Sequence, residues 1–153
     1  MCSTTILALL TAWSGEVLAH GGFQQTEDVD FQSDDAPVVS TTYGLLHPAS
    51  GQDWAWVCEE AVSDSSTWSI AVSTTDRWLA ATTSGLNWTD DHCDWSSSTG
   101  LEGLYVTQVT RDATLPDRIW ATTSSGTAEN AVWVSEDGGD SFSAHATFGD
   151  EST

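Results

Sequence analysis

Lysine is absent from this chain, and only three arginines stand against 23 aspartates and glutamates, which gives a formal net charge of -20 over 153 residues. A protein that binds nucleic acid by neutralising phosphates needs the opposite balance. Electrostatic attachment to anionic lipid is excluded for the same reason. The sequence therefore predicts neither a nucleic-acid partner nor a charge-driven membrane partner.

Helical patterns are also missing. No window places apolar residues at a spacing of 3.6, and serine and threonine are too frequent for stable helices. The chain is nevertheless not a disordered acidic segment, because hydrophobic residues make up 39% and nine tryptophans supply apolar area to bury. The length suits one domain with a real core.

The start of the chain resembles a secretory leader. The apolar run Ile6–Trp13 is too short to span a bilayer, and the small-residue stretch Val17-Leu18-Ala19 follows it. Basic residues usually precede such a run and are lacking here, so a buried first strand or helix stays an alternative. We expect residues 1–19 to be a signal peptide, and residues 20–153 to be secreted, periplasmic or at the cell surface without membrane insertion.

Three cysteines are present, and Cys2 would leave with the leader. The remaining pair, Cys58 and Cys93, predicts a disulfide in an exported chain, worth roughly 3 to 4 kcal/mol in the chain-entropy model. Two separate buried thiols are the alternative. No CxxC spacing suggests zinc, and no other metal or cofactor site is predicted.

A short phrase occurs three times at a constant interval. Its copies are Ser40–Gly44, Ala81–Gly85 and Ala121–Gly126, and successive closing glycines are 41 residues apart. Short β-rich runs with partial alternation precede each copy, so each unit reads as four strands separated by turns. A period near 40 with four strands per unit is typical of a β-propeller blade.

The predicted fold class is therefore all-β, with about three blades of four antiparallel strands. We place blade 1 at about 23–62, blade 2 at about 67–103 and blade 3 at about 104–148 within the propeller domain 20–153. Closed propellers need about four to eight blades. We expect the chain to be the N-terminal part of a longer propeller whose remaining blades are its partners; self-association into a ring is the alternative.

The third unit contains a turn motif, S-x-D-x-G-x-x-aromatic, at Ser135, Asp137, Gly139 and Phe142. Asp137 is suited to accept backbone N–H bonds across a hairpin turn, and Gly139 to adopt a positive φ. Here the chain resembles the BNR/Asp-box repeat propellers, which include sialidases, sortilin-type receptor domains and photosystem II assembly-factor-like proteins. The resemblance implies a structural turn at the blade periphery, away from the ligand-binding face, and no catalytic role for Asp137.

The other two units hold degenerate copies of the motif. In the second unit Trp88, Asp90, His92 and Trp95 occupy the four positions; in the first, His47, Ala49, Gly51 and Trp54 do so. We expect Trp54 and Trp95, like Phe142, to pack under their turns. A core between blades is expected for Trp56, Trp68, Trp78, Trp120 and Trp133. Trp88 has no predicted structural role.

Sialidase chemistry, as the resemblance implies it, requires three arginines on the substrate carboxylate, a tyrosine nucleophile with a glutamate, and an aspartate acid/base. The chain has Arg77, Arg111 and Arg118, but none lies in the family's Arg-Ile-Pro context, and Arg77 and Arg118 are at equivalent repeat positions that suggest a turn role. No residue is therefore predicted to be catalytic, and the 23 acids alone do not indicate a carboxylate pair.

The function expected from the sequence is an exported, non-enzymatic propeller module that presents a binding face to a protein or glycan. A fragment of a secreted, sialidase-like glycoside hydrolase, with catalytic residues outside this chain, is one alternative. An assembly or stability factor for an envelope complex is another, and it rests on the resemblance alone.

Overall fold

The computed structural model describes residues 25–33, 36–49, 53–63, 66–73, 75–124 and 130–148. The predicted signal peptide at 1–19 lies outside these residues. Within the described residues no helix is long and apolar enough to cross a membrane.

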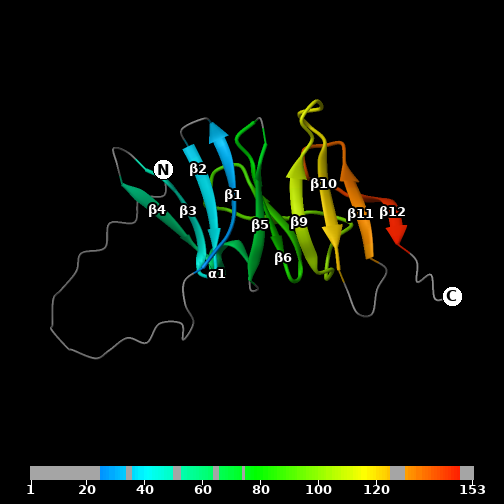
Figure 1. Ribbon diagram of the computed structural model, residues 1–153, viewed down its shortest axis with the longest axis horizontal. Helices are drawn as coiled ribbons and strands as arrows, with labels where there is room; N and C mark the ends of the chain where they lie inside the picture. The colour runs from blue at the N-terminus through cyan, green and yellow to red at the C-terminus, as the bar shows by residue number, and fades with distance from the viewer. Residues whose placement is uncertain are drawn as a thin grey trace.

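Three four-stranded antiparallel sheets form the described part of the chain (Figure 1). Neighbouring strands are consecutive in sequence, in the orders β1-β2-β3-β4, β5-β6-β7-β8 and β9-β10-β11-β12. This confirms the predicted fold class, and we call the sheets blades 1, 2 and 3. The elements are β1 (Thr26–Ser33), β2 (Ala36–Thr41), β3 (Gly44–Pro48), β4 (Trp54–Cys58), α1 (Glu59–Val62), β5 (Thr67–Val72), β6 (Trp78–Thr82), β7 (Gly85–Thr89), β8 (Ser96–Ser97), β9 (Val106–Arg111), β10 (Ile119–Thr123), β11 (Asn130–Ser135) and β12 (Ser143–Phe148).

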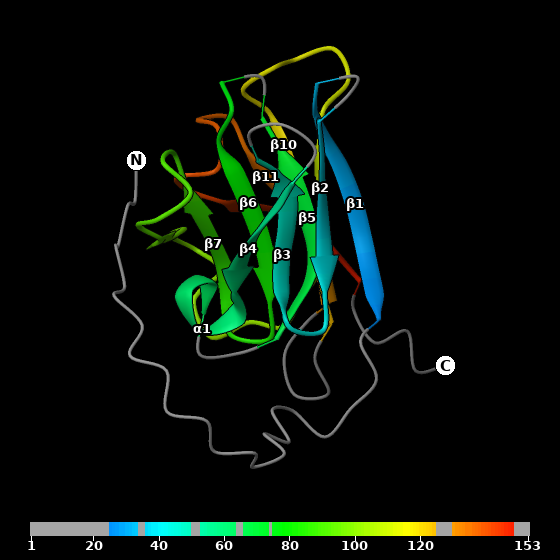
Figure 2. The same cartoon turned by 90° about the vertical axis from the view of Figure 1, so that its left-hand side faces the viewer.

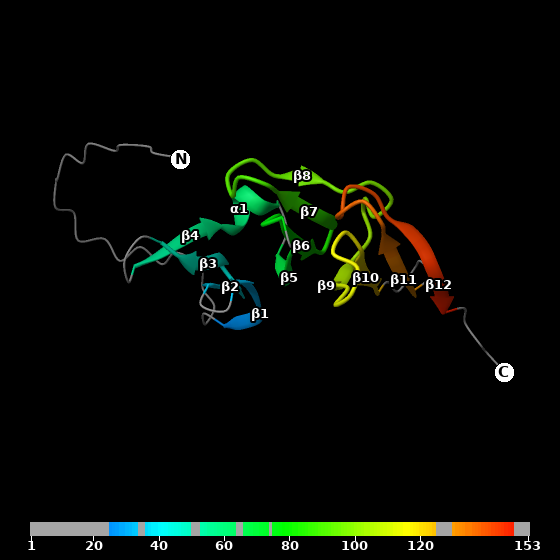
Figure 3. The ribbon, with the colours of Figure 1, turned by 90° about the horizontal axis from the view of Figure 1, so that it is seen from above.

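The blades stand side by side as successive sheets of a propeller, and their first strands β1, β5 and β9 lie along one edge (Figure 3). Side chains join these first strands. The Asp28 carboxylate accepts hydrogen bonds from the Ser69 hydroxyl at 2.7 Å and the Ile70 amide at 3.2 Å, and the Asp30 carboxylate accepts one from the Val72 amide at 2.7 Å. Acidic side chains of blade 1 thus satisfy backbone donors of blade 2.

The repeated Thr-Thr phrase forms the turn between the second and third strands of a blade. In blade 1 the Thr41 hydroxyl donates to the Gly44 carbonyl at 2.9 Å, and in blade 2 Thr82 makes the same bond to Gly85 at 2.9 Å. Gly44 has a φ of +121°, and a Cβ there would lie 2.1 Å from the Val57 carbonyl oxygen. Glycine is therefore required at this position both by conformation and by the close approach of β4.

The buried residues form two clusters, each lying between two blades. Val38 and Leu45 of blade 1 pack with Trp78 and Ala80 of β6, while Leu79 on the same strand packs with blade 3. All five residues of β6 are buried. Successive side chains of a strand point to opposite faces, so β6 serves both junctions at once.

One face of blade 1 is apolar and exposed. Cross-strand pairing places Phe31 opposite Pro37, and Leu46 opposite Trp56. Trp54 and Trp56 are 54% and 58% exposed. The expectation that Trp56 belongs to a core between blades is therefore wrong, because no described blade covers this face. The side chain of Trp68 lies outside the described part of the chain.

An aromatic cluster lies at the junction of blades 1 and 2. The His92 ring stacks on Trp78 at 3.8 Å between centroids, and His47 meets Trp78 edge-on at 4.9 Å. Burial, reinforced by the charge of nearby His92, lowers the pKa of His47, although a hydrogen bond to the Pro48 carbonyl partly opposes this. Neutral His47 is the form that fits this junction.

The predicted disulfide between Cys58 and Cys93 is not formed, because Cys58 is a free thiol. Cys58 ends β4 opposite Gly44, where β3 begins, whereas Cys93 follows the far end of β7. A strand of five residues spans roughly 16 Å, and disulfides require Cα atoms within about 7 Å. The repeat therefore places these two cysteines at opposite ends of their blades.

Trp78→Ala is expected to destabilise the chain by about 3–5 kcal/mol, because it empties the centre of the junction between blades 1 and 2. Trp54→Ala removes the same side chain from an exposed position and is expected to cost about 1 kcal/mol or less. Urea unfolding followed by circular dichroism measures both. Equal losses would contradict the assigned core.

Stability is expected to fall as the pH drops below about 6.5. The unfolded chain binds a proton at His47 more readily than the native chain, whose His47 pKa is lowered, so acidification favours unfolding. Urea unfolding between pH 5 and 7.5 measures the effect, and His47→Gln should remove part of it. His145→Gln, at an exposed residue of β12, is the control and should retain the slope.

Candidate functional site

The turn between β11 and β12 brings together the four residues of the predicted motif. Ser135 donates its hydroxyl proton to the Asp137 carboxylate at 2.6 Å and accepts the Gly139 amide at 2.9 Å. The same carboxylate accepts the Ser141 amide at 3.0 Å and the Ser141 hydroxyl. Asp137 thus binds both sides of the turn.

Ionisation of Asp137 is favoured by these bonds. Burial by itself would raise the pKa of Asp137, but hydrogen bonds from Ser135, Ser141 and the Asp140 amide outweigh it, and the pKa lies below its usual value. The carboxylate is therefore charged at neutral pH and engaged within its own turn, which suits a structural role.

The turn also packs against the preceding blade. Gly139 has a φ of +99°, and a Cβ there would lie 2.2 Å from Cδ2 of Leu79 in blade 2. Phe142 is only 7% exposed and belongs to the cluster between blades 2 and 3. Residues Ser98 and Thr99 hold the turn from the other side, through bonds to the Gly139 and Asp140 carbonyls at 2.6 and 2.9 Å.

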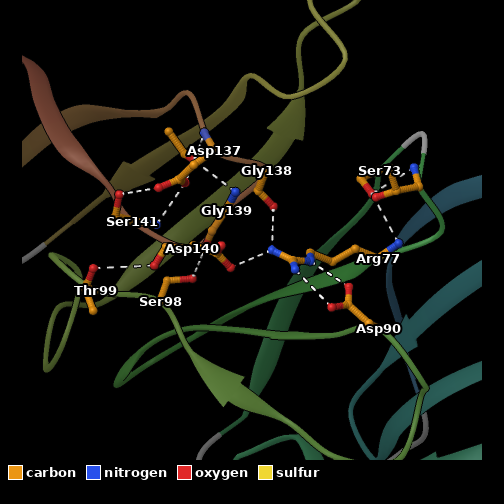
Figure 4. Close-up of polar contacts among 12 residues, drawn as sticks. Ser73, Arg77, Asp90, Ser98, Thr99, Asp137, Gly138, Gly139, Asp140 and Ser141 are labelled. Carbon is orange, nitrogen blue, oxygen red and sulfur yellow. Dashed lines mark hydrogen bonds and ion pairs between the residues drawn. The ribbon is translucent and has the colours of Figure 1, made fainter.

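Arg77 joins this turn to blade 2 (Figure 4). Its Nε and Nη2 donate to the two oxygens of Asp90 at 2.7 and 2.9 Å, and its Nη1 donates to Asp140 at 2.7 Å and to the Gly138 carbonyl at 3.3 Å. The guanidinium lies 3.9 Å above the ring of Trp88. Trp88, which had no predicted role, is thus the support for Arg77.

The structure shifts the motif of the second blade by one residue. Thr89 accepts the amides of Asp91 and His92, and the Asp91 carboxylate accepts those of Cys93 and Asp94. Thr89 and Asp91 therefore take the places of Ser135 and Asp137. The sequence assignment of Asp90 to this position was wrong, because the turn is one residue shorter than that of blade 3. A Thr-x-Asp match that begins at the last residue of the strand was the available signal.

The three arginines do not converge. Arg118 forms an ion pair with Glu136 in blade 3 at 2.7 Å, and Arg77 is bound to Asp90 and Asp140. Arg111 lines a separate hollow of about 260 Å³ beside Asp28 and Asp30. Among the described residues, no three His, Cys, Asp or Glu side chains gather to hold a metal ion.

A cleft of about 350 Å³ lies between α1 and blade 2, at the end where β7 begins. Figure 2 shows α1 at this end of the sheets, near β7. Residues of α1 and of two segments of blade 2 form the cleft, which is why no single motif indicated it. Its lining combines hydroxyl, amide, carboxylate and indole groups with a few apolar residues: Glu60, Ala61, Val62, Ser63, Ser84, Gly85, Leu86, Asn87, Trp95, Ser97, Ser98 and Glu102.

Hydrogen bonds fix part of this lining. Asn87 donates to the Val62 carbonyl at 2.6 Å and accepts the Ser97 hydroxyl at 2.9 Å, and Glu102 accepts the Gly100 amide at 2.8 Å. The buried Nε1 of Trp95 has no hydrogen-bond partner among the described residues. The cleft is thus a polar site with a held amide, two carboxylates and one indole.

No protein-family model and no curated protein matches this sequence. Among solved structures, the chain is similar to the crystal structure of an ancestral GH74 enzyme, a member of a β-propeller family, with a TM-score of 0.60 and 18% identity. The similarity covers 80% of this chain and 18% of that chain. At this identity the likeness shows the fold alone. The assignment to the BNR/Asp-box family stays a prediction; the supported conclusion is that the chain has a β-propeller fold.

Asp137→Ala is expected to destabilise the chain by roughly 1–3 kcal/mol, because it removes the acceptor that joins Ser135 and Ser141. Thermal and urea unfolding measure the loss. Asp94→Asn, in the corresponding turn of blade 2, changes an exposed carboxylate and is expected to be neutral. A neutral Asp137→Ala variant would show that the turn does not depend on this carboxylate.

Proposed function

We propose that the chain is an exported, non-enzymatic propeller module that binds a neutral glycan in the cleft between α1 and blade 2. The observation that carries the proposal is the chemistry of the cleft lining. Sugar hydroxyls donate and accept hydrogen bonds, and the cleft offers groups of both kinds beside an aromatic ring.

The side-chain amide of Asn87 is fixed by two hydrogen bonds, which supports a glycan as the ligand. Its nitrogen is bound to Val62 and its oxygen to Ser97, so the side chain has one orientation before a ligand arrives. A group that is ordered in advance loses little entropy on binding. Trp95 adds an aromatic ring to the lining of the cleft.

Charge favours a neutral glycan over an acidic one. Glu60 and Glu102 line the cleft, no arginine does so, and the whole chain carries a formal charge of -20. Like charges repel across short distances, and a desolvated anion needs a partner of opposite sign. A sialic acid carboxylate would find none here, which also disfavours the sialidase-like alternative.

Glycoside hydrolysis is the second candidate, favoured by the similarity to a GH74 enzyme and by the two cleft carboxylates. Hydrolysis requires one carboxyl group as acid and another as base or nucleophile. Glu102 is engaged with the Gly100 amide, which supports a positioning role for that carboxylate. The binding proposal is therefore preferred.

The test compares two adjacent glutamates of α1. Glu60 lines the cleft and Glu59 does not. Glu60→Ala is expected to weaken binding of a neutral oligosaccharide by roughly tenfold, a change of about 1.4 kcal/mol, because one carboxylate acceptor is lost. Glu59→Ala should leave the affinity unchanged. Isothermal titration against a panel of neutral and sialylated oligosaccharides measures both.

Three results would contradict the proposal. These are no binding of any neutral oligosaccharide, equal effects of the two variants, and tighter binding of sialylated members. Release of reducing sugar that is lost in Glu60→Gln or Glu102→Gln would establish the hydrolase instead.

A further inference from the structure

Arg77 and Arg118 occupy equivalent places in successive blades. Each directly precedes the second strand of its blade, and the two are 41 residues apart, the period of the repeat. Each binds the carboxylate that directly follows the third strand. Arg77 binds Asp90, and Arg118 binds Glu136 through Nε at 3.1 Å and Nη2 at 2.7 Å.

The two arginines differ in their third contact. Nη1 of Arg77 reaches across to the β11–β12 turn of blade 3, where it binds Asp140 and the Gly138 carbonyl. Nη1 of Arg118 has no partner among the described residues, and the Arg118 side chain is 30% exposed against 15% for Arg77. Arg118 thus has the bonds within its blade and lacks the bond between blades.

The surface around Arg118 repeats the surface around Arg77. In blade 2, Leu79 lies opposite Trp88 and packs against Gly139 of the β11–β12 turn in blade 3. In blade 3, Trp120 lies opposite Val134 in the same register, and both are only partly buried. This face of blade 3, formed by Arg118, Trp120 and Val134, is the counterpart of the face of blade 2 on which the β11–β12 turn packs.

We propose that this face of blade 3 docks a further four-stranded blade whose outer hairpin turn carries a Gly-Asp pair like Gly139-Asp140. The aspartate of that turn binds Nη1 of Arg118, and its glycine packs on Trp120. The inference rests on the repeat and is independent of the proposed glycan.

A second copy of the chain is a poorer occupant. Its Gly138–Asp140 turn is already bound to its own Arg77. The corresponding turn of blade 2 contains His92 and Cys93 in place of glycine. Two copies also repel each other, since each carries a formal charge of -20. A blade whose own turn is free and carries a Gly-Asp pair meets neither of the first two obstacles.

The test appends a second copy of residues 98–148 after residue 148 of the full chain and measures thermal unfolding. Arg118→Met is expected to lower the Tm of the extended chain by roughly 2–4 °C more than it lowers that of the original chain. Asp140→Asn in the appended copy should have the same effect, and the double variant should lose little more. Arg111→Met, which alters an arginine outside this face, is the control.

Equal Tm losses from Arg118→Met in the extended and original chains would overturn the proposal. A native chain that sediments as a dimer and dissociates in Arg118→Met would overturn the choice of occupant. If the extended chain fails to fold, a cyclic peptide of residues 134–143 is titrated against the original chain. Chemical-shift changes at the Arg118 Nε–H in that titration support the proposal, and their absence at saturating peptide overturns it.

Discussion

Every blade of this protein has two faces, and each buried face depends on a neighbouring sheet. A four-stranded sheet that is apolar on both sides cannot shield itself from water. The strand β6 shows the constraint most directly, because Trp78 and Ala80 face blade 1 while Leu79 and Ala81 face blade 3. The blades therefore stabilise one another, and the exposed Trp54 and Trp56 mark a face without a described neighbour.

The repeat could be recognised in the sequence because every blade must pack against its neighbours. A 41-residue interval between glycines predicted three sheets of four strands, and the bonds of Thr41 and Thr82 show what the repeated phrase does. The turn at Ser135–Phe142 could likewise be predicted, since its hydrogen bonds join residues close together in sequence. Features that depend on local contacts are carried by local patterns.

Other features depend on contacts between distant segments, and the sequence did not reveal them. The sequence predicted a core position for both Trp56 and Trp78, and only the covering of the blade faces separates the exposed Trp56 from the buried Trp78. Cys58 and Cys93 are separated because β4 and β7 place them at opposite ends. The one-residue difference between the turns of blades 2 and 3 displaced Asp90 from its assigned place. The cleft joins α1 to parts of blade 2, so no single motif encodes it.

Because cationic side chains are scarce in this chain, the positions of the arginines matter for how the acidic blades associate. In a chain with three arginines and 23 acids, there are too few arginines to pair with most of the carboxylates. Asp90 and Asp140 lie on one guanidinium, whose bond to Asp90 above all raises the pKa of Arg77, while the same bond lowers the pKa of Asp90. Without Arg77 these two carboxylates would repel each other across the junction of blades 2 and 3. One arginine thus converts a repulsive contact between acidic blades into an attractive one, and the equivalent position of Arg118 is the basis of the proposed contact with a further blade.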